Sequence, residues 1–507
     1  MSTTNRRPWL ILCICCMSLL IVGIDVTIVN VALPSIRHDL HSSLSGLQWV
    51  VDAYTLVIGS FLMASGSTAD RFGRRRVFQT GLVLFTLGSL LCSVAPSVTL
   101  LIVFRCLQAL GGSMLNPVAL SIISNTFTER RARARALGVW GAVFGVSLAL
   151  GPVLGGLLVT SLTWRAIFWI NIPIGIAAII LTKLFVPESR AAVARRFDPW
   201  GQLLIIVMLA SLTFGVIEGP SHGWGSPLIV AVFALAAAAA VTLVLVESRR
   251  DQPLLQVRFF RSLPFSGASA IAVLSFVVLT GFLFVNTLYL QDDRGYSALR
   301  AGLMTVPMAV MICIFAPVSG RLVGTRGPRL PLVLAGLLEA VAAALMLRLS
   351  GSTSTFYLLA DYMVFGLAFG LVNAPISNTA VSGMPNSQAG VAASVASASR
   401  QTGNALGVAI TGSLIAGASD AGLAAASHAA WAVLAACGLG VAVIGYASTG
   451  RRALATAQRV RESLGGDDAP AAPGRGGIPA GLGTPAGTGT PAATGTPAGT
   501  GQGRTDQ

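Results

Sequence analysis

The segment "GVWGAVFGVSLALGPVLGGLLV", residues 138–159, is long and apolar enough to cross a lipid bilayer, yet it contains six glycines and one proline. Inside a helix, a glycine costs about 1 kcal/mol relative to alanine, and a proline costs roughly 3 kcal/mol. Residues so unfavourable for a helix need a compensating role. Small residues let membrane helices approach closely, and a proline bends a helix. The segment therefore predicts a closely packed membrane helix with a kink at which the molecule hinges.

The composition of the whole chain also indicates a membrane protein. Of the 507 residues, 54% are hydrophobic and 10% are charged, whereas an ordinary soluble domain has about 25% charged residues. Residues 228–246 contain no charge, and a helix of this length, at about 1.5 Å per residue, crosses a hydrocarbon core of about 30 Å. Membrane barrel strands would alternate apolar and polar residues instead. We therefore expect an all-α integral membrane protein.

Arginine clusters follow one another at intervals of roughly 60 residues, the length of one helical hairpin, and the loops between them are poor in arginine. The positive-inside rule places these clusters in the cytoplasm, so the net charge of +15 does not indicate a nucleic-acid partner. Basic residues at both ends of the apolar region place both termini inside, which requires an even number of spans. The apolar runs predict fourteen spans, near residues 9–31, 46–66, 77–95, 98–118, 138–159, 165–186, 200–218, 228–246, 264–290, 299–319, 330–349, 355–376, 389–416 and 428–448.

A polar motif, "GSTADRFGRRRV", follows the second predicted span at residues 66–77. Gly73 allows a tight turn, and the acid Asp70 lies among bases where it can pair with neighbouring helix ends. A weaker copy, "SGRLVGTRGPR" at 319–329, follows the tenth span. A repeated motif of this kind is expected from a duplicated six-helix unit. We interpret the first motif as a candidate cytoplasmic gate formed by Gly66, Asp70, Arg71, Gly73 and Arg74. The alternative interpretation is an ordinary positively charged cytoplasmic loop.

Several acids lie within predicted spans, where an ionised carboxylate is unfavourable and burial favours its protonated form. Such acids mark functional sites by default. Glu339 has a second interpretation, as a local partner of a polar neighbour on a peripheral helix. Asp52 and Glu218 also have a second interpretation, as residues at the ends of their spans that are exposed to water. The candidates for binding a proton or a cation are Asp25, Asp361, Glu339 and Asp52.

Arg105 lies about one third of the way into the fourth span, where a charge costs about 2.5–3.5 kcal/mol on insertion scales. It must therefore face a cavity or a partner. An apolar cavity with one or two carboxylates suits amphipathic or cationic organic molecules. The remaining polar residues assigned to this cavity are Asn30, Asn116, Asn286 and Asn373.

The chain lacks the motifs of several other classes of protein. Its seven cysteines fall in apolar segments without the spacing of metal ligands. It has no phosphate-binding loop of the form G-x-x-x-x-G-K-[ST] and no visible nucleophile and base constellation. We therefore expect neither enzymatic activity nor a metal or other cofactor.

These motifs together resemble the major facilitator superfamily, in particular its fourteen-span branch of drug:proton antiporters. The stretch "IDVTIVNVALP" at 24–34 and the loop at 66–76 resemble motifs of that branch and of the superfamily. Arg105 and Gln108 match the basic motif of the fourth helix, although Ala109 and Ser147 stand where the family has glycine. The antiporter motif of the fifth helix is matched by Gly138, Gly151, Pro152, Gly155 and Gly156.

The resemblance implies two six-helix bundles plus a two-helix insertion. It divides the chain into a first bundle at 1–190, a linker with an extra hairpin at 191–261 and a second bundle at 262–450. A cytoplasmic tail at 451–507 is expected to be disordered from about residue 465, because it is rich in glycine, threonine, proline and alanine. In this fold the first and fourth helices of each bundle line the cavity, which would bring Asp25, Arg105 and Asp361 to face it.

The resemblance further implies a proton-coupled antiporter that exports amphipathic or cationic drugs or antibiotics by alternating access. Its expected partners are a small-molecule substrate, protons and the lipid bilayer of the cell membrane, with no nucleic acid, and it would act as a monomer. Three alternatives stay open: a dedicated exporter of one secondary metabolite, a proton-coupled importer, and a membrane sensor without transport.

Overall fold

The computed structural model describes residues 7–190, 198–250, 256–382, 384, 388–416 and 423–465, and these residues form helices without strands. Thirteen helices in this part of the chain are long and apolar enough to cross a membrane. The span predicted at 389–416 is a helix, α15 (Ala389–Ile415), but it is not among the thirteen. It contains the polar residues Arg400, Gln401 and Asn404.

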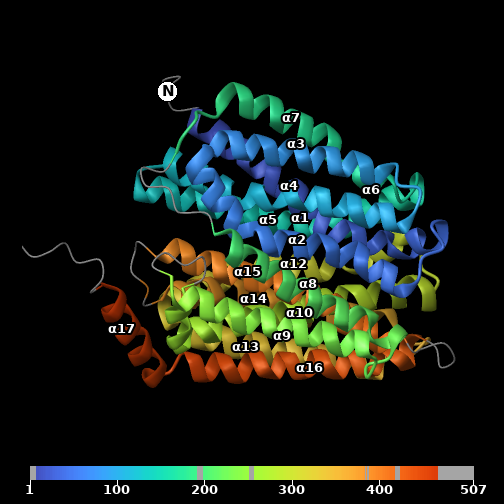
Figure 1. Cartoon of the computed structure of the whole chain (residues 1–507). Helices are drawn as coiled ribbons and strands as arrows, with labels where there is room; N and C mark the ends of the chain where they lie inside the picture. Colours follow the sequence, from blue (N-terminus) through green and yellow to red (C-terminus); the bar gives the residue numbers. More distant parts are fainter. Residues whose placement is uncertain are drawn as a thin grey trace, which may run out of the picture.

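The first bundle comprises six spans in the upper part of Figure 1. Within it, α3 packs on α4, α1 packs on α5, and α2 packs on α4. Serine side chains cap two of these helices at their first turn, Ser43 before α2 and Ser97 before α4. The sixth span is broken into two helices at Ile170. The bounds are α1 (Arg7–Asp39), α2 (Leu44–Phe72), α3 (Arg74–Ser93), α4 (Val98–Thr126), α5 (Arg130–Ser161), α6 (Ala166–Trp169) and α7 (Asn171–Phe185).

A hairpin of α8 (Pro199–His222) and α9 (Pro227–Ser248) follows the first bundle. One side of α8 packs against α2 of the first bundle and α15 of the second. By contrast, α9 packs on α8 and leaves large apolar side chains such as Val230 and Val241 exposed. The hairpin therefore bridges the two bundles and presents an apolar outer face.

The second bundle occupies the lower part of Figure 1, where α10 packs on α15, α12 on α14, and α13 on α16. The tenth predicted span is interrupted at Thr305. The first residues of the predicted tail form a further helix, α17, and residues 466–507 lie outside the described residues. The bounds are η2 (Val257–Arg261), α10 (Leu263–Leu288), η3 (Tyr289–Asp293), α11 (Ala298–Met304), α12 (Val306–Arg326), α13 (Arg329–Leu345), η4 (Met346–Arg348), α14 (Thr355–Val381), α16 (Leu423–Ser448) and α17 (Arg451–Gly465).

The two bundles meet closely at the end of the molecule opposite to α17. A Cβ atom added to Gly156 of α5 would lie 2.6 Å from the carbonyl oxygen of Ala298, so the two backbones are in direct contact. Gly302 of α11 faces the carbonyl oxygen of Pro152 in the same way. Beside these contacts, the backbone N–H of Leu299 donates to Oγ1 of Thr160 at 3.2 Å.

Amide side chains join the bundles at the same end. Gln48 of α2 donates from Nε2 to the carbonyl oxygens of Val408 and Ala409 on α15, at 3.2 and 3.0 Å. Gln291 of η3 donates from Nε2 to the carbonyl oxygen of Val31 on α1, at 2.9 Å. These bonds tie helix backbones of the two bundles together.

Towards the other end, α5 separates from the second bundle. A Cβ atom at Gly145 would meet Cys313 Sγ at 3.8 Å, whereas at Gly138 or Gly141 it would meet nothing within 4 Å. Close packing in this helix thus falls on its other half, where Gly151 and Gly155 contact α1. The expectation that small faces pack closely along this helix therefore holds at Gly155 and Gly156 but is wrong at Gly141. The two bundles are closed at one end and part along α5 at the other.

The glycine contacts at the closed end generate a first prediction. In Gly302→Val, the added side chain would collide with the backbone of Pro152, so the closed arrangement should become less populated. We expect a cysteine introduced at Ala298, which is 7% exposed in the closed arrangement, to react several times faster with a water-soluble maleimide in this variant, in a background without the native cysteines.

Gly141→Val is the matched control, because the space around Gly141 is open, and its labelling rate should equal that of the parent protein. Gly156→Val tests the same interface from α5. Equal labelling rates in Gly302→Val, Gly156→Val and the parent would contradict the close contact.

Candidate functional site

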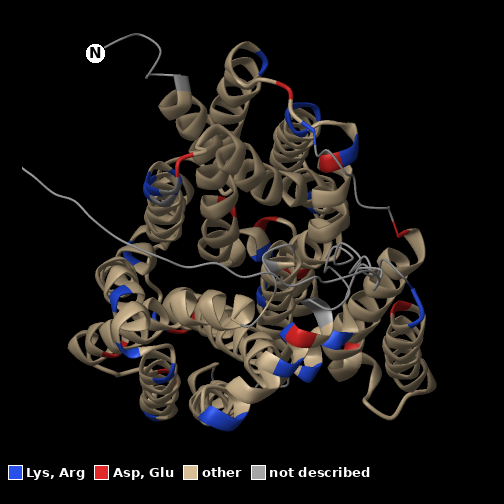
Figure 2. Ribbon diagram, turned by 90° about the vertical axis from the view of Figure 1, so that its left-hand side faces the viewer, with Lys and Arg blue, Asp and Glu red and all other residues tan. Residues whose placement is uncertain are grey.

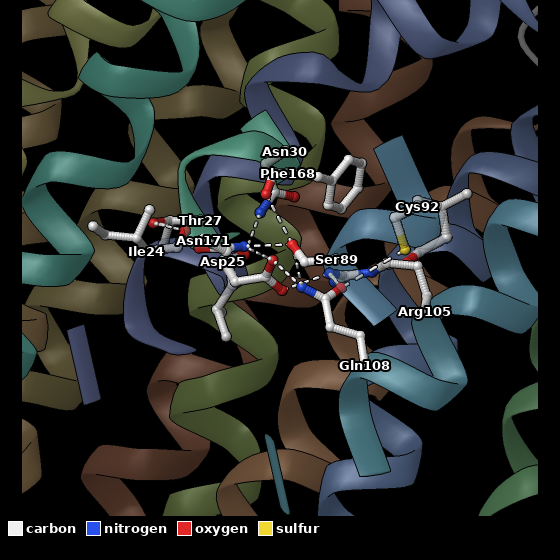
Figure 3. Close-up of polar contacts among 12 residues, drawn as sticks. Ile24, Asp25, Thr27, Asn30, Ser89, Cys92, Arg105, Gln108, Phe168 and Asn171 are labelled. Atoms are coloured by element: carbon white, nitrogen blue, oxygen red, sulfur yellow. Dashed lines mark hydrogen bonds and ion pairs between the residues drawn. The ribbon is translucent and has the colours of Figure 1, made fainter. Parts of the chain in front are cut away.

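A buried ion pair joins the first and fourth spans of the first bundle. Asp25 of α1 is 0% exposed and Arg105 of α4 is 1% exposed. Nη1 of Arg105 donates to Oδ2 of Asp25 at 2.5 Å. Figure 3 shows the two side chains directed towards each other between the helices. In an apolar interior a charged side chain needs an opposite charge beside it, and Asp25 and Arg105 supply this for each other.

Two amides and a hydroxyl group complete the surroundings of Asp25. Gln108 and Asn171 donate to Oδ1 of Asp25 at 2.8 and 3.2 Å, and Figure 3 shows both amides reaching the same carboxylate. Both amides also donate to Oγ of Ser89, at 3.3 and 3.0 Å. Ser89 in turn donates to the carbonyl oxygen of Phe168 at 3.0 Å. The network therefore joins α1, α3, α4, α6 and α7.

The guanidinium group of Arg105 has further partners besides Asp25. Its Nε donates to the carbonyl oxygen of Val50 at 3.2 Å, and its Nη1 donates to Oε1 of Gln108 at 2.9 Å. Its Cζ atom lies 4.0 Å from the centroid of the Tyr54 ring, within the range of a cation–π interaction. Because Val50 and Tyr54 belong to α2, Arg105 also links α4 to α2, and α2 contacts the second bundle.

Sequence analysis singled out Asp25 and Arg105 separately but missed three members of the network, Ser89, Asn171 and Tyr54. Asn171 offered a signal, because it is an amide inside the apolar run 165–186. Ser89 and Tyr54 offered none, since serine and tyrosine are common in membrane helices. In this network a carboxylate and a guanidinium group of opposite charge lie together, and amide side chains supply further donors to the carboxylate.

The other candidate acids lie apart from this ion pair. Asp52 and Asp361 are buried, and their carboxylate oxygens have no hydrogen-bond partner among the described residues. Asp52 is therefore not a rim residue. It lies between Gln48 and Gly59 on α2, both of which contact α15, so the second bundle covers this face. Glu218 is half-buried and accepts a hydrogen bond from Trp49 Nε1 at 2.9 Å.

Glu339 of α13 is also buried. Its Oε2 accepts a hydrogen bond from Oγ of Ser275 on α10 at 3.2 Å, which is the local polar partner that the alternative interpretation expects. None of the described residues form a group of three or more histidine, cysteine, aspartate or glutamate side chains suited to a metal ion.

The four predicted cavity amides do not form one cluster in the contacts of the described residues. Asn286 of α10 is buried, and its Oδ1 accepts a hydrogen bond from the hydroxyl group of Tyr362 on α14 at 2.5 Å. Asn30 donates to the carbonyl oxygen of Val26, one turn earlier on α1, at 3.1 Å. Asn116 and Asn373 are half-buried.

The predicted gate loop is held by its own bundle. Asp70 accepts from Nη2 of Arg74 at 3.0 Å, so its ion partner belongs to the same loop. Gly73 has a φ of 110°, in the region that favours glycine, and this lets the chain turn from α2 into α3. Glu188, just after α7, accepts a hydrogen bond from the backbone N–H of Arg75 at 3.0 Å. Nothing lies within 4 Å of the Cβ position of Gly66, and Arg71 is exposed.

Comparisons with known proteins extend these observations. The family model described as "Major Facilitator Superfamily" matches residues 15–408. The multidrug resistance protein Stp of Mycobacterium tuberculosis (strain CDC 1551 / Oshkosh) is 38% identical over 412 residues, covering 81% of this chain and 76% of that protein. The tetracenomycin C resistance and export protein of Streptomyces glaucescens is 35% identical over 416 residues, covering 82% and 77%.

Solved structures show the same fold at much lower identity. The human organic anion transporter MFSD10 is 16% identical with a TM-score of 0.59, covering 88% of this chain and 100% of that one. The xylose transporter XylE from E. coli is 14% identical with a TM-score of 0.61, covering 88% and 98%. Such a likeness concerns the arrangement of helices alone. Together with the family match over most of its length, it shows that this chain is a multi-pass membrane protein that belongs to the major facilitator superfamily.

Proposed function

We propose that this protein is a proton-coupled antiporter that exports amphipathic or cationic drugs from the cytoplasm by alternating access. The observation that carries this proposal is the Asp25–Arg105 ion pair, a protonatable group buried at the centre of the first bundle. Family membership makes the protein a transporter, and the names of its relatives refer to multidrug efflux and antibiotic resistance. A small organic molecule is therefore the expected cargo.

The orientation in the membrane rests on the charge distribution, and the direction of transport rests on relatives that are named as an export protein and an efflux pump. Figure 2 looks onto the end of the molecule that carries α17, and arginines lie at the helix ends around it. This end includes the motif at 70–76, and the positive-inside rule assigns it to the cytoplasm of a cell whose plasma membrane holds the protein. Both termini then lie inside. The bundles are closed at the outer end and part along α5 on the cytoplasmic side, so a substrate would enter from the cytoplasm.

Proton coupling would follow from the contacts of Asp25. When the carboxylate is ionised, it holds Arg105, Gln108 and Asn171 in place. Uptake of a proton removes that charge and leaves the arginine without its opposite charge, so α4 must repack relative to α1. Loss of the proton restores the network. A change of protonation at one carboxylate thereby favours one arrangement of the helices over the other.

Three other acids are candidates for additional proton or cation sites. Asp361 and Glu339 would serve the second bundle, and Asp52 would serve the contact of α2 with α15. Each is buried, and a cationic substrate that approached one of these carboxylates would compete with a proton for it. Arg105 and the amides Asn30, Asn116, Asn286 and Asn373 would supply the other polar contacts of the transport pathway.

A narrower function is a second candidate, because several relatives are named for a single antibiotic. These relatives include the methylenomycin A resistance protein of Streptomyces coelicolor and the puromycin resistance protein of Streptomyces alboniger. A panel of lipophilic cations, neutral antibiotics and anionic metabolites, offered to proteoliposomes under an imposed pH gradient, separates the two candidates. Transport of several cations supports a multidrug exporter, and transport of one compound supports a dedicated one.

Replacement of the buried carboxylate tests the coupling directly. Asparagine in Asp25→Asn preserves the shape of the side chain but cannot exchange a proton, so transport driven by a pH gradient should fall about tenfold or more, equivalent to about 1.4 kcal/mol. The measurement is ethidium transport by proteoliposomes, with size-exclusion chromatography to confirm folding.

Asp39→Asn is the matched control, because Asp39 also lies on α1 but pairs with Arg165 near the surface. It should transport at the rate of the parent protein. Undiminished pH-driven transport by Asp25→Asn would refute the role of Asp25.

A stability experiment tests the pairing itself. Arg105→Ala leaves Asp25 as a buried charge without compensation, which should lower the free energy of unfolding by about 3–5 kcal/mol. The double variant Asp25→Asn, Arg105→Gln removes both charges and should be more stable than Arg105→Ala. Thermal unfolding in detergent gives the comparison. If the double variant is as unstable as Arg105→Ala, or less stable, then charge compensation does not hold α1 and α4 together.

A further inference from the structure

The loop between α12 and α13 repeats the turn of the loop between α2 and α3 but not its charge pairing. Gly327 has a φ of 80° where Gly73 has 110°, so both loops turn in the region that favours glycine. Gly324 stands where the first loop has Asp70, the ion partner of Arg74. The second loop therefore keeps the turn and lacks the internal acid.

The arginines of the second loop also lack the other kind of partner found in the first. In the first loop, Glu188 lies 3.9 Å from Arg75 and 3.8 Å from Arg76. By contrast, Arg326 at the end of α12 and Arg329 at the start of α13 are exposed and form no ion pair with a described residue. Their charge is available to an anion from outside the chain.

Arg329 stacks on an exposed tyrosine at the end of a neighbouring span. Its Cζ atom lies 3.7 Å from the centroid of the Tyr446 ring on α16, within the range of a cation–π interaction. Tyr446 is exposed, and its hydroxyl group makes no hydrogen bond with a described residue. A tyrosine at the end of a span is typical of the level of the lipid headgroups. Two more exposed arginines, Arg451 and Arg452, follow at the start of α17.

An apolar surface extends along α13 and α16 from these charges. Figure 1 shows the two helices side by side at the lower edge of the second bundle. A Cβ atom added to Gly336 of α13 would lie 2.3 Å from the backbone nitrogen of Ala442 on α16, so the two backbones are in direct contact. The large apolar side chains that the pair leaves exposed are Leu330, Leu334, Leu337, Val341, Leu439 and Val443.

The described acids of the second bundle do not balance the charge at this end. Glu462 on α17 is the one described acid of this bundle near these arginines, and it accepts a hydrogen bond from Nε2 of Gln458 at 3.2 Å. The other described acids of the bundle are buried in spans or lie at the closed end, namely Asp292, Asp293, Glu339 and Asp361. The surface therefore complements a negatively charged partner.

We propose that this surface binds an anionic phospholipid of the cytoplasmic leaflet. The headgroup phosphate accepts hydrogen bonds from Arg326, Arg329 and the hydroxyl group of Tyr446, and Arg451 and Arg452 add attraction. The acyl chains lie on the exposed leucine and valine side chains of α13 and α16. Clusters of basic residues at the cytoplasmic ends of spans bind acidic headgroups in this way. The proposal rests on the cytoplasmic assignment of this end and not on the identity of the cargo.

Quenching of a fluorescent label by brominated lipids tests the proposal. The label is bimane on the cysteine of Leu334→Cys, in the full chain without native cysteines, reconstituted in bilayers. Brominated phosphatidylglycerol should occupy the surface about fivefold more readily than brominated phosphatidylcholine at equal mole fraction, the effect of one arginine near a charged membrane surface. In the double variant Arg326→Gln, Arg329→Gln, the two lipids should quench almost equally.

The matched control is the double variant Arg75→Gln, Arg76→Gln, which removes two charges from the corresponding loop of the first bundle. Its preference for phosphatidylglycerol at the labelled position should equal that of the parent protein. Arg329→Lys keeps the charge and should retain most of the preference, which a purely structural role of Arg329 does not predict. Size-exclusion chromatography confirms that each variant is folded.

Equal quenching by the two lipids in the parent protein would overturn the proposal, and so would a preference that survives in Arg326→Gln, Arg329→Gln. Loss of the preference in millimolar inorganic phosphate would also overturn it, because the occupant would then be a soluble phosphate. A label that neither lipid quenches would contradict it as well, since a second copy of the chain would then cover the surface. The measurement uses neither substrate nor a pH gradient, so its failure is distinguishable from a failure of proton-coupled export.

Discussion

The first bundle depends on one constraint: a charge inside a membrane protein must find its compensation within the protein. Asp25 and Arg105 satisfy each other, and Gln108 and Asn171 supply the remaining donors. These partners come from different helices. The need of the Asp25 carboxylate for hydrogen-bond donors and an opposite charge therefore fixes how most helices of the bundle are placed. A rearrangement that separates α1 from α4 must break the pair or neutralise it first. In the proposed function, the protonation state of this carboxylate would be the condition for such a movement.

The two bundles are joined by a different kind of contact. At the closed end, the glycines of α5 and α11 bring backbones together, and Gln48 and Gln291 donate to main-chain carbonyl groups. No ion pair has to be broken in these glycine and amide contacts when the closed end opens. An exposed ion pair, Arg37 on α1 with Asp292 on η3 at 3.7 Å, also joins the bundles at this end. Strong compensation within a bundle and weaker or more exposed contacts between bundles suit the rocking of rigid halves. The α8–α9 hairpin is an addition to this plan that touches both halves.

Much of the fold could be predicted from the sequence, because apolar length and arginine spacing report directly on membrane spans. The site could be predicted one residue at a time, since the energetic cost of a charge in lipid marks Asp25 and Arg105 without revealing that they pair. Their partners come from distant segments, and an amide such as Asn171 acquires its role through packing that no local pattern encodes. Asp52 shows the same limit: its position near a helix end suggested exposure to water, but α15 covers that face.

The backbone contacts of Gly156 and Gly302 also bear on how such a carrier evolves. Where two main chains touch, a mutation in one surface has no side chain opposite that could shrink to accommodate it. Substitutions at this end would therefore accumulate slowly, because a second substitution on the opposite surface could not compensate for the first. Around Gly138 and Gly141, where the helix has open space, larger residues are tolerated without strain. Substitutions would thus be accepted more readily at Gly138 and Gly141 than at the backbone contacts of Gly156 and Gly302.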